Sequence, residues 1–316
     1  MKIEELRTVC DKMLSEISTV IVGKRQTLEL VLTGFLANGH ILFEDFPGLA
    51  KTLLSKLFAQ GIGCRFRRIQ FTPDLLPADI TGTYVLNRRD GEFTLRRGPI
   101  FANILLADEI NRAPPKTQSA LLEGMQERQV TIEGDTFPLE RPFIVIATQN
   151  PIEYEGTYPL PEAQIDRFMM RLSIGYPNKQ EEVEILTRRI NSQTDDYRVN
   201  AIMTPELFQE AQNVIEQVHV DETIKEYVVE IVQKTRTHSL VGLGASPRGA
   251  LAMMHLSRAK AALTGRDFVV PEDVKAVAVG ALSHRLLLKS GTWLAGTKAE
   301  EIVRGILDEV KAPRAG

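Results

Sequence analysis

The sequence is poor in cysteine and in long apolar runs, and both absences narrow the class of protein. Cys10 and Cys64 are its two cysteines, and neither belongs to a C-x-x-C pair. They therefore provide neither a disulfide framework nor a zinc site, which is typical of a reducing compartment. No run reaches the roughly 18 apolar residues that cross a bilayer, and the N-terminal segment has no apolar signal-peptide core. We expect a cytoplasmic protein without direct membrane insertion.

A strong excess of one charge is also absent. The 316 residues carry a formal net charge of −3, with 43% hydrophobic and 25% charged residues. This is the balance of an ordinary globular protein long enough for two domains. It gives no global electrostatic reason to bind nucleic acid, so no nucleic-acid partner is expected. The five histidines show no metal-ligand spacing, and packing roles are the simplest interpretation for them.

Short apolar runs alternate with helical patterns over the first part of the chain. HILFED, NILLADE, FIVIAT and FMMRLSI are typical of buried parallel strands, and FRRIQFT is a more polar run of the edge type. Helical periodicity occupies the first 40 residues and returns in KTLLSKLFAQ and TQSALLEGMQE. The sequence therefore predicts an α/β domain over residues 1–192, with a parallel sheet and helices on both faces.

Two hairpins interrupt this alternation, and helices replace it towards the C-terminus. Asp90-Gly91 and Gly134-Asp135 each lie between strand-like segments, which predicts hairpin insertions at about 81–98 and 129–142. A polar stretch, NSQTDDYRVN, is followed by five segments with helical periodicity. Residues 193–316 are therefore predicted to form an all-helical lid domain.

The segment ILFEDFPGLAKTLLSKL places a strand, a tight loop, Lys-Thr and a helix in succession, which is the architecture of a P-loop. In such a loop backbone N–H groups hold phosphates, Lys51 reaches the terminal phosphates, and Thr52 ligates Mg²⁺. The strict pattern G-x-x-x-x-G-K-[ST] is not met, because Asp45 and Ala50 occupy its glycine positions. Asp tolerates left-handed backbone better than most residues and Ala adds only a methyl group, so we expect the loop to keep its shape. The predicted nucleotide-binding residues of this segment are Asp45, Pro47, Gly48, Leu49, Ala50, Lys51, Thr52 and Leu53.

A pair of acids completes the predicted site. NILLADE is an apolar strand that ends in Asp108-Glu109. Asp108 emerges where a Walker B aspartate holds Mg²⁺, and Glu109 is placed to polarise an attacking water as general base. Each motif alone has a plainer alternative, a Pro-Gly turn before a helix or two solvated acids at a strand end. Both motifs on successive core strands, in this order, predict ATP hydrolysis with Mg²⁺ rather than binding alone.

These motifs belong to longer stretches that resemble the MoxR family of AAA+ ATPases. EDFPGLAKT, LLADEINRAPPKTQSALLEGMQERQVTIEG, IATQNP, LPEAQIDRF and SPRGAL carry the resemblance, which extends from about Ile21 to the last helices. It implies a P-loop AAA+ core, a helical lid and assembly into a homo-oligomeric ring of six. It also implies chaperone-like activation of partner proteins, with proteins that contain a metal-binding von Willebrand A domain as the expected clients.

The resemblance assigns roles to residues outside the two motifs. Asn150 matches sensor 1, which orients the attacking water, and Arg167 matches an arginine finger that acts on the neighbouring subunit's nucleotide. Arg248 matches sensor 2, a phosphate contact made from the lid; a cation at a helix N-terminus also needs an anion to offset the helix dipole. Plainer alternatives are a turn residue for Asn150 and a local ion pair, for example with Asp166, for Arg167. The segment expected to line the adenine pocket comprises Ile21, Val22 and Gly23.

Other functions stay open at this point. A nucleic-acid motor would use the arginines of the first hairpin, for which a solvated hairpin is the plainer explanation. A nucleotide-gated scaffold would bind ATP tightly without turnover. The magnesium chelatase ATPase subunit is a close structural cousin, so insertion of a metal into a cofactor is a further alternative. The hairpin arginines are Arg88, Arg89, Arg96 and Arg97.

Overall fold

The computed structural model describes residues 1–89, 91–150, 156–291 and 296–313. Its core is a five-stranded sheet in the order β2-β5-β8-β1-β9, and every neighbouring pair in it is parallel. The polar run predicted as an edge strand, β2, lies at one edge. The strands are β1 (Ile41–Glu44), β2 (Phe66–Gln70), β5 (Ile104–Asp108), β8 (Ile144–Gln149) and β9 (Met170–Leu172).

Alternate residues of the central strands supply two separate hydrophobic cores. Ile104 and Leu106 of β5 belong to one core, and Leu105 and Ala107 belong to the other, as the two-residue period of a strand requires. The predicted parallel sheet with helices on both faces is therefore confirmed. The first face is covered by α1 (Ile3–Ser18), α2 (Arg25–Leu36), α3 (Lys51–Ile62) and the lid helices, and the second by α4 (Pro77–Thr81) and α5 (Pro115–Glu127).

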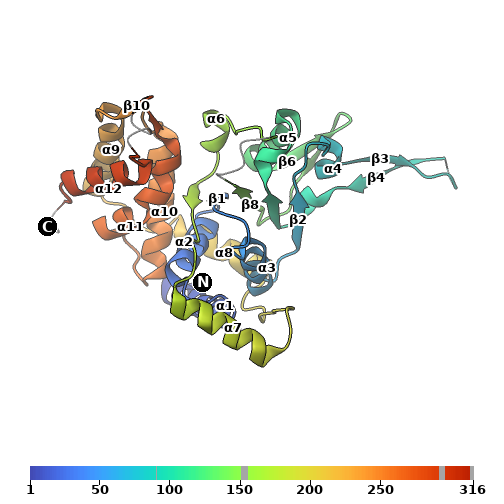
Figure 1. Ribbon diagram of the computed structural model, residues 1–316, viewed down its shortest axis with the longest axis horizontal. Helices are drawn as coiled ribbons and strands as arrows, with labels where there is room; N and C mark the ends of the chain where they lie inside the picture. The colour runs from blue at the N-terminus through green and yellow to red at the C-terminus, as the bar shows by residue number, and fades with distance from the viewer. Residues whose placement is uncertain (90, 151–155, 292–295, 314–316) are drawn as a thin grey trace.

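Two antiparallel hairpins are inserted into this core. β3 (Gly82–Leu86) pairs with β4 (Phe93–Arg97), and β6 (Gln129–Ile132) pairs with β7 (Asp135–Pro138). Both fall within the predicted ranges, although Asp90 of the first predicted turn lies outside the described residues. The first hairpin projects from the end of the molecule opposite the lid (Figure 1).

The C-terminal lid is helical, as predicted, and it carries one short ladder that the sequence prediction lacks. β10 (Val241–Leu243) pairs with β11 (Leu287–Leu288). The pattern PEDVKAVAVGALSHRLLL predicts one continuous helix, but α11 ends at Leu282 and a 3₁₀ turn, η3 (Ser283–Arg285), follows. The break lets Arg285 reach Asp166 of the core, so a tertiary ion pair overrides helical periodicity. The helices are α8 (Pro205–Ile215), α9 (Glu222–Thr237), α10 (Pro247–Leu263), α11 (Pro271–Leu282) and α12 (Ala299–Glu309).

Core and lid share one hydrophobic cluster. Helices α1 and α2 both contact α10 of the lid, and their buried residues belong to the same cluster as those of the lid helices. The boundary at residues 192 and 193 stays a prediction.

None of the described helices is long and apolar enough to cross a bilayer. In chain order α6 (Glu162–Ile165) lies between β8 and β9, and α7 (Lys179–Ser192) follows β9. Two 3₁₀ turns, η1 (Pro99–Phe101) and η2 (Ile110–Arg112), flank β5.

Candidate functional site

The carboxyl ends of three neighbouring strands, β1, β5 and β8, meet at one edge of the sheet. The loop after β1, the acids at the end of β5 and the polar end of β8 together enclose a cavity of about 500 Å³. Parallel sheets bind ligands at this edge because the loops that follow each strand open there. The predicted residues that line the cavity are Asp45, Pro47, Gly48, Leu49, Ala50, Lys51, Thr52, Leu53, Asp108, Glu109 and Asn150.

Ala50, which occupies a glycine position of the P-loop pattern, has left-handed backbone. Ala50, at the N-terminus of α3, has φ 56° and ψ 20°, which is the left-handed region. Gly48 within the loop has φ 83°. Left-handed backbone costs a residue with a Cβ roughly 1–2 kcal/mol, so Ala50 adopts the conformation at a modest cost.

Asp45 works differently from its prediction. It is not among the residues with positive φ, so the expectation that it exploits left-handed backbone is wrong. Its carboxylate is buried and accepts hydrogen bonds from the hydroxyl of Ser173 at 2.6 Å and from the backbone N–H groups of Ile174 at 2.6 Å and Gly175 at 3.3 Å. A glycine could not make these bonds. Asp45 therefore ties the phosphate loop to the chain that follows β9.

Lys51 lies across the loop with its charge partly shielded from solvent. Its Nζ donates to the backbone carbonyls of Asp45 and Phe46, both at 3.0 Å. Burial lowers the pKa of Lys51, while the nearby carboxylates, Asp45, Asp108 and Glu109, act in the opposite direction. The amine is thus positioned beside the helix N-terminus, where a phosphate would supply the counter-charge.

Asp108 is held from two sides. Its Oδ1 accepts a hydrogen bond from Thr148 Oγ1 at 2.6 Å. Its Oδ2 accepts from Nε of Arg68 at 3.0 Å and from Nη2 of Arg68 at 2.7 Å. Thr148 lies on β8 and Arg68 on β2, the two neighbours of the strand that carries Asp108. The arrangement fixes the carboxylate at the mouth of the cavity and compensates its charge.

Glu109 is held equally firmly. Its backbone is left-handed, with φ 56° and ψ 50°, and its N–H donates to Thr148 Oγ1 at 2.8 Å. Its Oε2 accepts from Gln70 Nε2 at 2.7 Å and from Arg112 Nη1 at 2.8 Å. Each acid of the pair therefore forms an ion pair with an arginine, Asp108 with Arg68 and Glu109 with Arg112.

Four of these partners were not predicted from the sequence: Arg68, Gln70, Arg112 and Thr148. A signal for three of them was present, because Gln70 ends the polar strand FRRIQ, Arg68 lies two residues before it, and Thr148 lies two residues before Asn150. Residues at the carboxyl ends of neighbouring parallel strands lie side by side. Predicting these partners also requires the order of the strands in the sheet, which the sequence alone does not reveal.

The donor set suits Mg²⁺ bound together with a nucleotide. Mg²⁺ prefers oxygen ligands and commonly uses one or two protein groups together with phosphate oxygens and waters. Thr52 and Asp108 supply a hydroxyl and a carboxylate within one cavity. Among the described residues there is no cluster of three or more His, Cys, Asp or Glu that could hold a metal without a nucleotide.

A smaller apolar cavity adjoins the one lined by the P-loop and the acid pair, which is called the phosphate cavity from here on. It measures about 180 Å³ and shares Gly48, Leu49, Ala50 and Leu53 with the larger one. Ile21 and Val22, which are predicted to line an adenine pocket, line this cavity together with residues that include Ile185 and Tyr197. Its size and apolar lining suit a purine base.

Gly23 is placed beside this cavity rather than in its lining. A Cβ there would come within 2.0 Å of Glu181 Oε1, and the backbone has φ 71°. Glycine is therefore required for the close approach of Glu181 on α7 and for the left-handed backbone.

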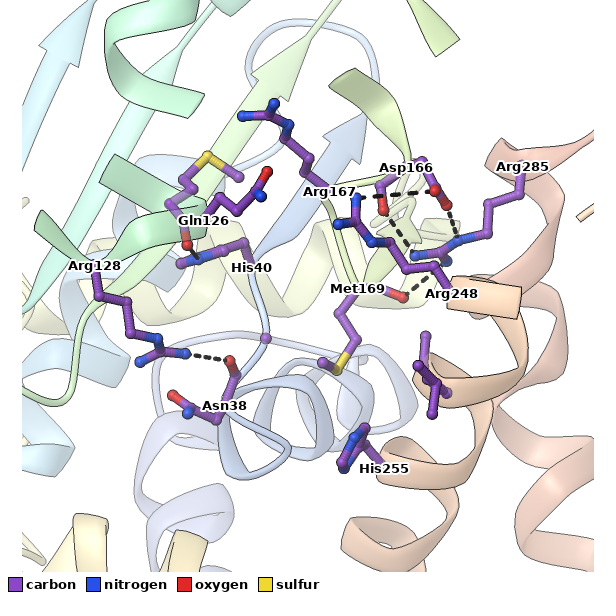
Figure 2. A pocket seen from close by; sticks show the side chains of 14 residues that line it. Asn38, His40, Gln126, Arg128, Asp166, Arg167, Met169, Arg248, His255 and Arg285 are labelled. Atoms are coloured by element: carbon purple, nitrogen blue, oxygen red, sulfur yellow. Dashed lines mark hydrogen bonds and ion pairs between the residues drawn. The ribbon is translucent and has the colours of Figure 1, made fainter. Parts of the chain in front are cut away.

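The two predicted arginines, Arg167 and Arg248, line a different cavity of about 270 Å³ (Figure 2). Arg248 and Arg285 converge there on Asp166, with Nη1 of Arg248 at 4.0 Å from Oδ2 and Nε of Arg285 at 2.7 Å from Oδ1. The side chain of Arg285 is 2% exposed and that of Arg248 is 48% exposed. Burial lowers the pKa of Arg285, and Asp166 opposes that shift. Arg285 is thus the structural partner of Asp166, and Arg248 keeps a free side.

Arg167 points away from Asp166 (Figure 2) and donates from Nη1 to the carbonyl of Leu122 on α5 at 2.9 Å. The alternative of an ion pair with Asp166 is therefore not realised, since Asp166 binds Arg285. Neither Arg167 nor Arg248 lines the phosphate cavity of its own chain. The structure brings these two together and keeps both apart from the P-loop.

Comparison with known proteins identifies the family. The family model described as "ATPase family associated with various cellular activities (AAA)" matches residues 40–170, and the model of the AAA lid domain matches residues 233–306. A Mycobacterium tuberculosis protein named Chaperone MoxR1 is 44% identical over 96% of this chain and 82% of its own length. The chain belongs to the MoxR family of AAA+ ATPases.

Two further proteins match nearly the whole chain. The Bacillus subtilis protein YeaC is 49% identical over 98% of this chain and 97% of its own. A solved structure from Cytophaga hutchinsonii is 42% identical, with a TM-score of 0.92 over 99% of this chain and 97% of that one. In this MoxR-family chain, then, the P-loop segment with the acid pair and the two arginines occupy separate cavities of one subunit.

Proposed function

We propose that this MoxR-family chain hydrolyses ATP with Mg²⁺ in a ring of subunits and uses the cycle to remodel partner proteins. The observation that carries the proposal is the cavity in which the P-loop, the acid pair and Asn150 meet. Phosphoryl transfer needs mainly positioning and charge stabilisation from a protein, and these residues offer both.

Each residue of the cavity has a definite task in this proposal. Lys51 and the N-terminus of α3 bind the terminal phosphates, while Thr52 and Asp108 hold Mg²⁺, which neutralises phosphate charge when bound. Glu109 accepts the proton of the attacking water. Asn150 orients that water from the end of β8. Because Gln70 and Arg112 both bind Oε2 of Glu109, this oxygen must lose at least one donor before it can act as base.

The placement of Arg167 and Arg248 supports the ring. Both lie outside the phosphate cavity of their own chain, and Arg248 has an exposed side chain close to Asp166. A guanidinium group is well suited to bind phosphate oxygens with two bonds. We propose that both arginines act on the nucleotide of the neighbouring subunit, so that the site is complete only in the oligomer. The number of six subunits follows the family resemblance.

Steady-state ATP hydrolysis, measured with Mg²⁺ over a wide series of protein concentrations, tests this proposal. Activity per subunit should rise with concentration and then level off as the ring fills, and sedimentation should show the oligomer over the same range. Constant activity per subunit at every concentration would contradict a shared site. Tight ATP binding without turnover at any concentration would favour the nucleotide-gated scaffold.

The client is proposed to be a protein with a von Willebrand A domain, and the place of action is proposed to be the cytoplasm. The chaperone name of the Mycobacterium tuberculosis relative supports remodelling of proteins, and the two unbridged cysteines, Cys10 and Cys64, support a reducing compartment. Stimulation of ATP hydrolysis by a purified von Willebrand A protein, but not by double-stranded DNA, is the expected result. The reverse pattern would favour a nucleic-acid motor.

A further inference from the structure

A groove at the base of the first hairpin takes no part in the proposed hydrolysis. It has a volume of about 660 Å³ and runs along edge strand β2 to the end of β4 and the η1 turn. The residues that line it are Arg65, Phe66, Arg67, Arg68, Arg97, Gly98, Pro99, Phe101 and Ala102. Four of these nine residues are arginines, and two are aromatic.

The positive charge of the groove is only partly compensated. Arg65 is bound by Glu140 at 2.6 Å. Within the described part of the chain, no ion pair involves Arg67 or Arg97, and both are exposed. The guanidinium of Arg97 lies over the ring of Phe101, 4.9 Å from its centre. Such stacking orients the cation without neutralising it, so the groove presents fixed donors to an anionic ligand.

The backbone of β2 adds hydrogen-bonding groups to the groove. The N–H of Ile104 donates to the carbonyl of Arg65, and the N–H of Phe71 donates to the carbonyl of Asp108. Odd-numbered residues of β2 thus direct their backbone groups at β5, and even-numbered residues direct theirs away from the sheet. In the described residues β2 pairs only with β5. An extended peptide could pair with this open edge, as in strand addition.

Arg68 connects the groove with the phosphate cavity, since it lines both. Its guanidinium binds Oδ2 of Asp108 at 2.7 Å. A carboxylate in the groove would therefore compete with Asp108 for the same guanidinium.

We propose that this groove binds an acidic, extended segment of a polypeptide, and that the bound segment draws Arg68 away from Asp108. Unpaired arginines and an open strand edge in one groove suit a peptide with carboxylate side chains. A nucleic acid has no backbone N–H or C=O pattern to pair with β2, so the open strand edge favours a polypeptide over a nucleic acid. The binding step is independent of the proposed function, whereas the release of Asp108 rests on its proposed role as Mg²⁺ ligand.

Fluorescence anisotropy of a labelled ten-residue poly-glutamate peptide tests the binding step, with the full chain and without nucleotide. The double variant Arg67→Glu/Arg97→Glu should bind at least about ten-fold more weakly than the wild type, because two charge-assisted contacts are lost. Arg67→Gln/Arg97→Gln, which removes the two charges without reversing them, should fall between them. The matched control Lys275→Glu/Arg304→Glu makes the same change of charge at exposed positions on α11 and α12 and should bind like the wild type.

Two results would overturn the binding step. One is equal affinity of the groove variant, the lid control and the wild type for poly-glutamate. The other is tighter binding of a twenty-residue thymidine oligonucleotide with the same dependence on Arg67 and Arg97, which would make the groove a nucleic-acid site. A ten-residue poly-lysine peptide serves as the probe of opposite charge and should not bind.

The link to Asp108 is tested through nucleotide binding, which needs no turnover. With saturating poly-glutamate, the Mg²⁺ concentration required for half-maximal binding of a fluorescent ATP analogue should fall at least about three-fold in the wild type, because Asp108 no longer shares its charge with Arg68. In Arg68→Gln the peptide should leave this concentration unchanged. An unchanged Mg²⁺ requirement in the wild type, with the peptide bound, would refute the link. Loss of nucleotide binding altogether would refute the proposed function and leave the peptide site standing.

Discussion

Two cavities of this chain are built in different ways. One is the phosphate cavity, and the other is the cavity lined by Arg167, Arg248 and Arg285, called the arginine cavity below. The first is made at the edge of one sheet, where its acids, Asp108 and Glu109, lie at the end of a single strand. The second is made where the lid meets the core, and Asp166 is brought to Arg248 and Arg285 from distant parts of the sequence. One cavity collects carboxylates and a phosphate loop, and the other collects guanidinium groups. The comparison shows two cavities of different composition in one subunit, and the proposed function makes them the two halves of a site shared between neighbours.

Within the arginine cavity, two arginines beside the same carboxylate differ in how far they are buried. Asp166 binds Arg285, which is buried, and lies near Arg248, which is about half exposed. A buried ion pair with several further hydrogen bonds is a structural element, since removing one partner leaves an uncompensated charge. The exposed arginine retains donors for an outside anion. Burial, rather than residue type, separates the two roles.

The strongest test of the division between the cavities is Arg167→Ala. We expect ATP hydrolysis to fall about 10³-fold or more, the usual effect of losing an arginine finger, while ATP binding is kept. Mixed with Glu109→Gln, which has an intact Arg167 but no base, the variant should recover part of the activity, because one neighbour supplies the arginine and the other the base. Exposed Arg304→Ala is the control, and it should hydrolyse ATP like the wild type. Full ATPase activity of Arg167→Ala would contradict the proposal that Arg167 acts at the phosphate cavity of a neighbouring subunit.

Glu109→Gln by itself tests whether the phosphate cavity supplies the general base. Turnover should fall about 10²- to 10⁴-fold, the range of a lost general base, with ATP binding retained because Gln keeps the size of the side chain. Single-turnover hydrolysis and binding of a fluorescent ATP analogue measure the two effects separately. Rapid hydrolysis by this variant would exclude Glu109 as the base.

Restoring each glycine of the P-loop pattern should have opposite effects at its two positions. Asp45→Gly should lower the free energy of unfolding by about 3 kcal/mol, because three donors on the chain after β9 lose their buried acceptor. Ala50→Gly should raise it by up to about 1 kcal/mol, because glycine adopts the left-handed backbone without strain. Denaturant unfolding of both variants, compared with the wild type, measures the difference. Equal effects of the two changes would show that Asp45 acts through its backbone after all.

The smallest expected effect concerns His40, which lies in the wall of the arginine cavity. Its Nδ1 accepts from the N–H of Val145 at 2.9 Å, its Nε2 lies 3.0 Å from the carbonyl of Met125, and burial lowers its pKa from 6.5 to about 4. A depressed pKa means that the neutral form stabilises the fold above pH 6.5 and that this contribution is lost as the pH falls towards 4. Between pH 6.5 and pH 5 the wild type should lose about 2 kcal/mol relative to His40→Gln. Unfolding measured at several pH values checks this, and parallel pH profiles of the two proteins would contradict it.

Much of the fold and of the phosphate cavity could be predicted from the sequence, because the signals there are local. Strand, loop and helix follow one another from Ile41 to Ile62, and the acid pair ends its own strand, so no knowledge of distant contacts is needed. Local reasoning failed at Asp45, where a backbone argument was used for a residue whose side chain makes the decisive contacts. It also missed Arg68, Gln70 and Thr148, because their importance depends on which strands are neighbours.

The sequence by itself determined the α/β core, the helical lid and the residues that line the phosphate cavity, since apolar periodicity and short motifs act over a few neighbouring residues. The tertiary structure decided which cavity each arginine enters. Arg68 reaches Asp108 because β2 pairs with β5, and Arg285 reaches Asp166 because the lid docks on the core. Such pairs join residues far apart in the chain, and their energy depends on burial and direction, which exist only after the elements have packed.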